Sequence, residues 1–173
     1  MSVSGLFNSH LIMAAAVQRF GSEEMKQEYL PKFASGELRG GIALTEPDAG
    51  TDLQGIRVRA KKDGDDYVID GTKTWITNSD EGEILAVRVK TDPDAEPKHR
   101  GMSLLLVPKS AGWKASKLKK LGYRGIDTGE VQFPGVRVQK FLNLYAATKS
   151  EEFLRHVARN RRIGWICDDD VSA

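Results

Sequence analysis

The sequence predicts an α+β chain in which a short N-terminal helical segment is followed by an antiparallel β-barrel. Two observations predict this fold class. Up to about residue 38, apolar residues recur three and four positions apart, which is the period of a helix with one buried face. After Arg39, short segments rich in valine, isoleucine and leucine alternate with turn residues, as they do in antiparallel barrels and sandwiches.

Two helices are expected in the first segment. The first covers residues 6–20 and places its apolar residues along one stripe. Ser22 is expected to cap a second helix, because a side-chain oxygen at this position can accept an N–H of the first turn. That helix is expected to run to about Tyr29, and Pro31 is expected to open a separate short turn over residues 32–34.

Seven or eight strands are expected after residue 39. The segments with strand composition cover residues 56–60, 67–69, 73–77, 84–89, 102–107, 113–118 and 128–133. Asp63 and Gly64 predict a tight hairpin turn, because this dipeptide readily supplies the positive φ that such a turn needs. Residues 91–101 contain two prolines and several charges, which predicts an exposed loop.

Composition excludes several classes of protein. The 173 residues are 40% hydrophobic and 29% charged, which is typical of a soluble globular chain of roughly one domain. The formal net charge is +2, so no overall field favours nucleic acid or an anionic membrane. The apolar stretch 11–17 is far shorter than the about 20 residues that span a bilayer. We therefore expect no membrane span. The single Cys167 cannot form an internal disulfide, which fits a cytoplasmic protein.

Residues 43–52 are the first candidate for chemistry. This segment leaves a strand and enters a loop that contains Gly50 and the hydroxyls of Thr45 and Thr51. Such a loop can present N–H groups and hydroxyls to an anionic or carbonyl-rich ligand. The same residue types also build ordinary turns in unrelated proteins, so the segment alone leaves both interpretations open.

Residues 73–78 are the second candidate. Trp75 and Thr77 are two positions apart in an expected strand, so their side chains are expected on one face. A flat apolar ring beside a hydroxyl could stack on a heteroaromatic cofactor and bond to it. A tryptophan in a β domain is also a common core residue, so this segment alone leaves two interpretations open as well.

Together, the two segments resemble the acyl-CoA dehydrogenase family. The signature of that family's middle domain reads aliphatic, Ser or Thr, Glu, two variable residues, a small residue, Gly, Ser or Thr, and Asp. Residues 44–52 satisfy every position of this signature. Further matching segments stand at residues 20–24, 29–31, 34–37, 71–78 and 127–133.

The resemblance covers residues 1–142 and implies a division of the chain into three parts. Residues 1–38 correspond to the end of an N-terminal helical domain, and residues 39–142 to a middle β-barrel domain. Residues 143–173 depart from the family pattern and are expected to be an atypical tail. The family's C-terminal helical bundle is expected to be absent.

The resemblance implies an FAD enzyme that removes two hydrogens from the α and β carbons of an acyl-CoA thioester and leaves a trans-2-enoyl-CoA. The implied partners are the acyl-CoA substrate and an electron-transfer flavoprotein as electron acceptor. Intact members of the family form homo-oligomers. Seven residues are implied to bind the cofactor: Ile42, Leu44, Thr45, Gly50, Thr51, Trp75 and Thr77. Thr51 is also implied to bind the substrate.

The resemblance also implies where these residues would meet the flavin. The backbone from Ile42 to Thr45 and the Thr45 hydroxyl would contact the pyrimidine edge. Gly50 and Thr51 would lie near the pyrophosphate and the thioester arm of CoA. Trp75 would pack on the isoalloxazine, and Thr77 would bond near N5. Hydroxyls and N–H groups placed in this way can stabilise negative charge on a reduced flavin.

No catalytic residue and no metal ligand is expected in this chain. Glu46 is an acid within the first segment, but the resemblance makes it a structural member of the motif. The glutamate that takes the α proton in the family belongs to the C-terminal bundle. Two alternatives stay open: a related flavoprotein of the acyl-CoA oxidase or nitroalkane oxidase type, and a non-catalytic flavin- or CoA-binding remnant.

A basic strip is formed by Lys114, Lys117, Lys119 and Lys120. A solvent-facing strand is the expected interpretation, since runs of charge usually lie on a solvated face. Contact with the phosphates of CoA is the alternative.

Overall fold

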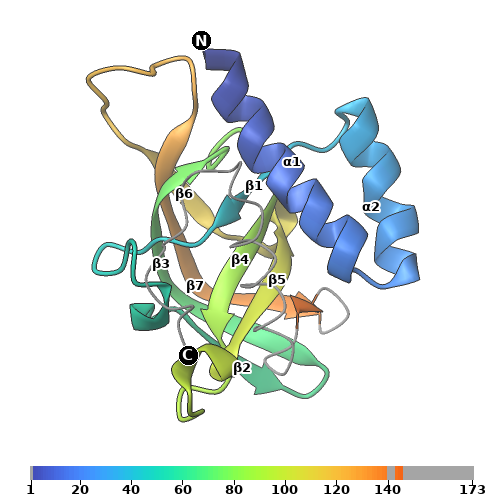
Figure 1. The fold of residues 1–173 in the computed structure, drawn as a ribbon, viewed down its shortest axis with the longest axis vertical. Coiled ribbons are helices and arrows are strands. Elements are labelled where there is room, and N and C mark those ends of the chain that lie inside the picture. Colours follow the sequence, from blue (N-terminus) through green and yellow to red (C-terminus); the bar gives the residue numbers. More distant parts are fainter. Residues whose placement is uncertain (1, 140–142, 146–173) are drawn as a thin grey trace, which may run out of the picture.

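The structure, a computed structural model, describes residues 2–139 and 143–145. Two helices lie on one side of a curled β-sheet (Figure 1). Helix α1 (Ser2–Phe20) packs against the sheet and against α2 (Glu23–Ser35). Of the expected tail at residues 143–173, the structure describes only Asn143–Tyr145, which pair with a strand of the sheet, and the rest lies outside the described residues. No helix in the described part of the chain is long and apolar enough to cross a membrane.

Helix α2 begins where the sequence predicts, but it continues past Tyr29, its expected end, to Ser35. The Ser22 hydroxyl accepts the N–H of Met25 at 3.2 Å, and Gly36 adopts a left-handed φ of 77° just after the last turn. The predicted break at Pro31 is wrong, because the helix continues to Ser35. Tyr29 and Phe33 are both buried and their rings stack, so packing on both sides of Pro31 outweighs the one hydrogen bond that proline removes.

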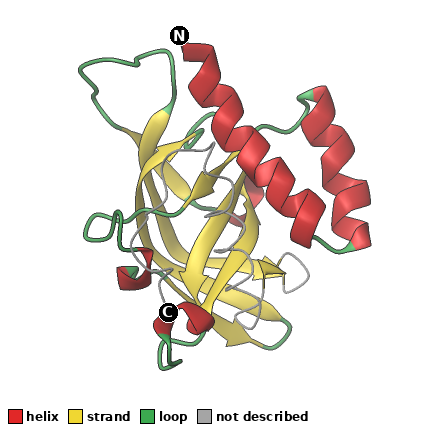
Figure 2. Cartoon of the chain, viewed as in Figure 1, coloured by secondary structure: helices red, strands yellow, loops and turns green. Residues whose placement is uncertain are grey.

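The strands form one curled sheet with several short helical turns in its loops (Figure 2). The strands are β1 (Gly40–Ala43), β2 (Arg59–Asp63), β3 (Asp66–Thr77), β4 (Ile84–Lys90), β5 (Met102–Pro108), β6 (Lys114–Lys117), β7 (Thr128–Gln139) and β8 (Asn143–Tyr145). The helical turns are η1 (Leu53–Gly55), η2 (Lys98–Gly101) and η3 (Lys109–Ala111). The strand order is β6-β7-β3-β2-β4-β5-β8, and β1 pairs with β4 off this path.

The expected fold class is confirmed, and the sheet is a half-barrel with mixed strand directions. Most neighbouring strands are antiparallel, but β1 pairs with β4 in parallel and β2 meets β4 in parallel at Arg59 and Lys90. β2 and β3 lie between β1 and β4 along the chain, and parallel strands require a long connection of this kind. This non-local pairing has no signature in the local pattern of residues.

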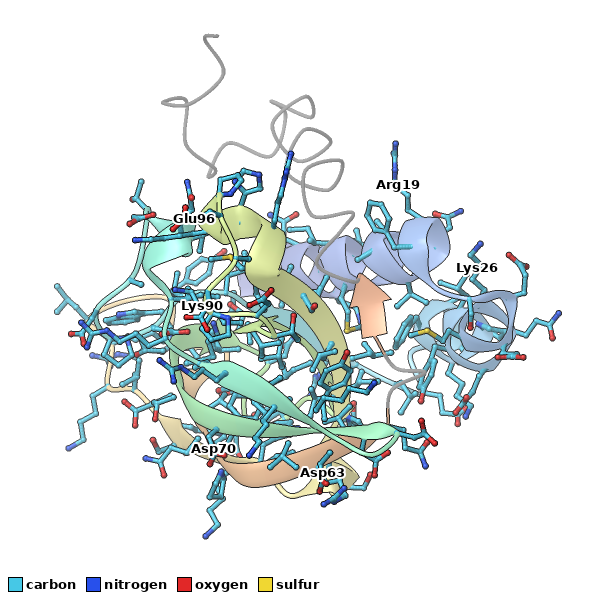
Figure 3. All side chains as sticks on the ribbon, turned by 90° about the horizontal axis from the view of Figure 1, so that it is seen from below. Arg19, Lys26, Asp63, Asp70, Lys90 and Glu96 are labelled. Atoms are coloured by element: carbon cyan, nitrogen blue, oxygen red, sulfur yellow. The ribbon has the colours of Figure 1, made fainter. Side chains whose placement is uncertain are left out.

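The β2–β3 hairpin follows the sequence prediction closely. Asp63 pairs with Asp66, and Gly64 takes a φ of 61° at the first loop position between them. Arg137 on β7 pairs with the carboxylates of Asp63 and Asp66 at the turn end of this hairpin, where Asp63 is labelled in Figure 3. The two segments expected at residues 67–69 and 73–77 are one long strand, β3, interrupted by irregular pairing with β7.

Strand β1 fits tightly between β3 and β4. A Cβ on Gly41 would lie 2.3 Å from the Thr77 carbonyl oxygen, and a Cβ on Gly40 would lie 2.3 Å from the Ile84 carbonyl oxygen. Only glycine allows this approach of backbone to backbone. The tight fit brings the end of β1 beside the end of β3, which is where the two candidate segments lie.

Gly41→Ala is expected to lower the free energy of unfolding by about 1–3 kcal/mol, because the added methyl group displaces β1 from β3. Chemical denaturation followed by circular dichroism measures this change. Gly122→Ala is the matched control, since a Cβ on Gly122 meets no atom within 4 Å and should change stability by less than about 0.5 kcal/mol. Equal effects of the two substitutions would contradict the close approach.

Candidate functional site

The fold brings the two candidate segments side by side through hydrogen bonds at Thr45 and Thr74. The Thr74 N–H donates to the Thr45 carbonyl oxygen at 2.9 Å, and the Thr45 hydroxyl donates to the Thr74 carbonyl oxygen. Segments that are 29 residues apart in the sequence are therefore joined directly. Because the Thr45 hydroxyl donates its hydrogen to the Thr74 carbonyl oxygen, it can only accept hydrogen bonds from a ligand.

A buried ion pair adds a second link between the same segments. The Lys73 ammonium donates to the Glu46 carboxylate and to the Leu44 carbonyl oxygen, both at 2.8 Å. The Lys73 side chain is fully buried, and the Glu46 side chain is 5% exposed. Burial is the largest influence on Lys73 and lowers its pKa to about 8. The Glu46 carboxylate opposes that shift, and the nearby Arg88 cation adds to it.

Glu46 has further partners that fix the loop after β1. Its carboxylate oxygens accept the backbone N–H groups of Arg57 at 2.5 Å and Val58 at 3.0 Å. Its own backbone exchanges hydrogen bonds with Ala49 in a tight turn. The carboxylate is thus committed to three donors and withdrawn from water, which agrees with a structural role and leaves it poorly placed to take a proton from a substrate.

Trp75 is the most unusual residue of the candidate site. Its side chain is 62% exposed, although large aromatic rings are usually buried. Its backbone has a φ of 60°, the left-handed region that bulky residues rarely occupy. Exposure of an aromatic ring on a strained backbone is typical of a functional position, because neither feature stabilises the chain by itself.

A β-bulge explains how Trp75 becomes exposed. Three steps along β3, from Lys73 to Ile76, face only two steps along β7, from Val131 to Gly129. The extra residue breaks the strict alternation of side chains, which would have put residues 73 and 75 on one face. Lys73 therefore points into the interior while Trp75 points outward.

Thr77 lies at the end of β3, next to a turn that Asp127 holds. Thr77 is half-buried and pairs with Thr128 on β7. The Asp127 carboxylate accepts the N–H groups of Asp80 at 2.6 Å and Glu81 at 2.8 Å. Asn78 donates from its side-chain amide to the Gly40 carbonyl oxygen at 2.8 Å, which ties this turn back to β1.

The remaining candidate residues occupy the edges of the same region. Ile42 and Leu44 are half-buried at the end of β1, whereas Gly50 and Thr51 are exposed on the following loop. A Cβ on Gly50 would meet no atom within 4 Å, so this loop has open space beside it. Asp52 closes the loop by accepting the N–H of Gln54 at 3.0 Å.

Three of these residues offer groups suited to a flat ligand. Thr45 offers hydroxyl lone pairs, Trp75 offers an exposed ring, and Thr77 offers a second hydroxyl that is only half-buried. An aromatic ring together with hydroxyls suits a flat heteroaromatic group with polar edges. The chemistry of the residues therefore fits a flavin ring.

Sequence reasoning missed the role of Lys73, because the strand pattern gives no sign that its side chain is buried. In the basic strip, Lys114, Lys117 and Lys119 are exposed, which agrees with the expected solvent-facing position, whereas Lys120 is half-buried. Lys117 pairs with Asp80 and Glu81. Lys120 donates to the carbonyl oxygens of Tyr123 and Ile126 and to the Thr128 hydroxyl, so it holds its own loop together.

A cavity of about 600 Å³ lies beside this loop, and basic and acidic side chains both line it. Its charged lining residues are Glu81, Lys117, Lys119, Lys120, Arg124 and Asp127. None of the seven predicted cofactor residues is among its lining residues. The candidate site is therefore an open surface around Trp75 rather than this cavity.

Comparison with known proteins establishes the family. The family profile described as acyl-CoA dehydrogenase, middle domain, matches residues 41–136, and the corresponding N-terminal domain profile matches residues 1–37. Mitochondrial isovaleryl-CoA dehydrogenase of Pongo abelii is 43% identical over 122 residues, which cover 69% of this chain and 29% of that protein. The chain belongs to the acyl-CoA dehydrogenase family.

Solved structures agree with this assignment. The crystal structure of an acyl-CoA dehydrogenase from Geobacillus kaustophilus superposes with a TM-score of 0.81 and 40% identity, covering 86% of this chain and 40% of that one. A glutaryl-CoA dehydrogenase in complex with glutaryl-CoA gives a TM-score of 0.83 at 31% identity, covering 90% of this chain and 41% of that one. The chain thus spans well under half the length of the relatives it matches.

Burial of Lys73 predicts a characteristic pH dependence of stability. Because its pKa is about 8 in the folded chain and 10.5 ordinarily, the unfolded chain binds more protons between these values. The contribution of Lys73 to the free energy of unfolding should therefore rise as pH increases from about 8 to 10.5. Denaturation of the parent chain and of Lys73→Met across this range measures the contribution by difference.

Lys61→Met is the control, since Lys61 is an exposed lysine on β2. Because this variant keeps Lys73, it should keep the rise in the free energy of unfolding that Lys73 causes between pH 8 and 10.5. A Lys73 contribution that falls between pH 8 and 10.5 would contradict the lowered pKa.

Proposed function

We propose that this chain carries the flavin-facing surface of an FAD-dependent acyl-CoA dehydrogenase. The reaction is α,β-dehydrogenation of an acyl-CoA thioester to a trans-2-enoyl-CoA. The observation that carries this proposal is Trp75, an exposed ring on a left-handed backbone that lies next to the Thr45–Thr74 link. A ring held in this way is ready to pack on a flat cofactor, because no reorganisation of the core is needed to expose it.

The other predicted residues are proposed to bind the cofactor around Trp75. The backbone from Ile42 to Thr45 would face the pyrimidine edge, with the Thr45 hydroxyl accepting a hydrogen bond. Thr77 would bond near N5, and Gly50 with Thr51 would lie near the pyrophosphate and the CoA arm. When bound, FAD would supply the acceptor for the hydride from the β carbon. The Thr77 hydroxyl and backbone N–H groups at its edge would donate hydrogen bonds that stabilise negative charge, whereas the Thr45 hydroxyl would only accept one.

Two similar proteins support FAD as the cofactor and an acyl-CoA thioester as the substrate. A glutaryl-CoA dehydrogenase from Mycobacterium smegmatis, 35% identical with a TM-score of 0.70, was solved in complex with FADH2. The glutaryl-CoA complex described above supports a CoA thioester as the substrate class. We assign no base to the described residues of this chain, because Glu46 is committed to its buried contacts.

The electron acceptor separates the dehydrogenase from its first alternative. We propose an electron-transfer flavoprotein, which is supported by similarity to a chain in the electron transferring flavoprotein structure of Acidaminococcus fermentans, at 32% identity and a TM-score of 0.79. Similarity to the prolyl acyl carrier protein oxidase AnaB, at 27% identity and a TM-score of 0.76, supports an oxidase instead. Slow reoxidation of the reduced flavin in air would favour the dehydrogenase, and rapid reoxidation the oxidase.

Two further properties belong to the proposal. The chain is proposed to form a homo-oligomer, as the resemblance to intact family members implies. It is proposed to be cytoplasmic, although several curated relatives are described as mitochondrial.

The test begins with the purified chain, which is incubated with FAD, desalted and examined by flavin absorbance. Retained flavin supports the proposal, and bleaching on anaerobic addition of one member of an acyl-CoA series identifies the preferred substrate. Retained flavin that no thioester reduces would favour a non-catalytic flavin-binding remnant. A chain that retains no flavin at FAD concentrations well above micromolar would contradict the proposal.

Trp75→Gly is expected to weaken FAD binding at least about fivefold, since stacking on an aromatic ring contributes about 1 kcal/mol. The cofactor-free chain should keep its free energy of unfolding within about 1 kcal/mol, because glycine tolerates the left-handed backbone. Titration with FAD and chemical denaturation measure the two effects separately.

Leu121→Ala serves as the control, because Leu121 is 98% exposed and lies outside the candidate site. It should change neither quantity. Loss of stability in Trp75→Gly with unchanged FAD affinity would show that the ring serves the fold instead.

A further inference from the structure

We propose that the buried Lys73–Glu46 ion pair is a positioning device for the flavin-binding surface, an inference that rests on the proposed function. The pair itself does not reach the surface, since Lys73 is fully buried and Glu46 is 5% exposed. It acts through the backbone on either side of it. Leu44 and Thr45 precede Glu46, and Thr74 and Trp75 follow Lys73, so each charged residue adjoins residues that face the cofactor.

The contacts of Lys73 set the position of the first segment. One ammonium group holds both the Leu44 carbonyl oxygen and the Glu46 carboxylate, each at 2.8 Å. These two acceptors flank Thr45, so the lysine fixes the backbone on both sides of the hydroxyl that is proposed to meet the flavin. A single cation with several donors can satisfy two acceptors in this way.

The same contacts set the position of the second segment. The buried Lys73 side chain holds the backbone at the residue where the β-bulge begins. The position of Lys73 therefore sets the outward direction of the Trp75 side chain. The described strand pairings join β1 to β4 and contain no ladder between β1 and β3. Asn78 ties the end of β3 to the start of β1 through the Gly40 carbonyl oxygen. The links beside Thr45 and Trp75 themselves are the two hydrogen bonds at Thr74 and the contacts of Lys73.

Stability alone does not account for an ion pair at this place. A buried pair is often no more stabilising than apolar side chains of similar volume, because both charges lose their hydration. Glu46 also holds the Arg57 and Val58 N–H groups, so it connects the loop after β1 to the residues before β2. The ion pair thus holds three backbone segments in fixed positions relative to one another, which is a positioning role in addition to any stabilising one.

The test compares the parent chain with Lys73→Met and with the double variant Lys73→Met/Glu46→Gln. The double variant removes both charges of the pair together, and its glutamine oxygen can still accept the Arg57 or Val58 N–H. Both variants are expected to bind FAD about tenfold or more weakly than the parent chain, because the binding surface is no longer held in register. Lys61→Met, an exposed lysine on β2, should bind FAD as the parent chain does.

Amide hydrogen exchange separates local positioning from general destabilisation. In the cofactor-free variants, exchange of the Thr74 amide should accelerate at least about tenfold more than exchange in the central β4–β5 ladder, which reports global unfolding. Equal acceleration at both places would show that the pair only stabilises the fold and would overturn the proposal. A folded double variant with parental FAD affinity would overturn it as well.

Failure of the proposed function is recognisable independently. If the parent chain does not bind FAD, that function fails, and the comparison of Thr74 with the β4–β5 ladder still decides whether Lys73 positions this surface.

Discussion

The buried contact between Lys73 and Glu46 is the interaction on which the rest of the candidate site depends. It lies where β1 ends and where β3 begins its bulge, and it joins two segments that no described strand pairing connects. Removing one partner of such a pair leaves an uncompensated buried charge and costs about 3–5 kcal/mol. That magnitude is a large fraction of the stability of a small domain, so the chain has little freedom to place these segments differently.

The half-barrel surrounds this contact with well-connected backbone, and the surface that it presents carries the unusual conformation of Trp75. Gly40 and Gly41 let β1 enter between β3 and β4, and Asn78 and Asp127 fasten the turn after β3. Against this frame, Trp75 keeps an exposed ring and a left-handed backbone. Strain at one surface residue is tolerated because the surrounding backbone is held from several directions.

Local features of the fold could be predicted from the sequence because short-range physics decides them. The Ser22 cap and the Gly64 turn are examples, and both are confirmed. The parallel placement of β1 could not be predicted, since it depends on pairing with a strand more than forty residues away. The break expected at Pro31 is wrong because tertiary packing of Tyr29 and Phe33 overrides the local preference.

For the candidate site, the motif spacing located the two segments but not the contact between them. Strict alternation along a strand would have put Lys73 on the same face as Trp75, and only the bulge separates them. A bulge leaves no reliable sign in one sequence, so the buried lysine was not predictable. The resemblance did predict that Glu46 is structural, and its three donors explain why.

The most direct test of the central claim is a double-mutant cycle on the free energy of unfolding with Lys73→Met, Glu46→Gln and the pair combined. If the buried contact joins the two segments, the coupling free energy should be about 1.5–3 kcal/mol, because each single substitution leaves the other group unpaired. A coupling free energy below about 0.5 kcal/mol would mean that the two residues act independently and would contradict this account of the site.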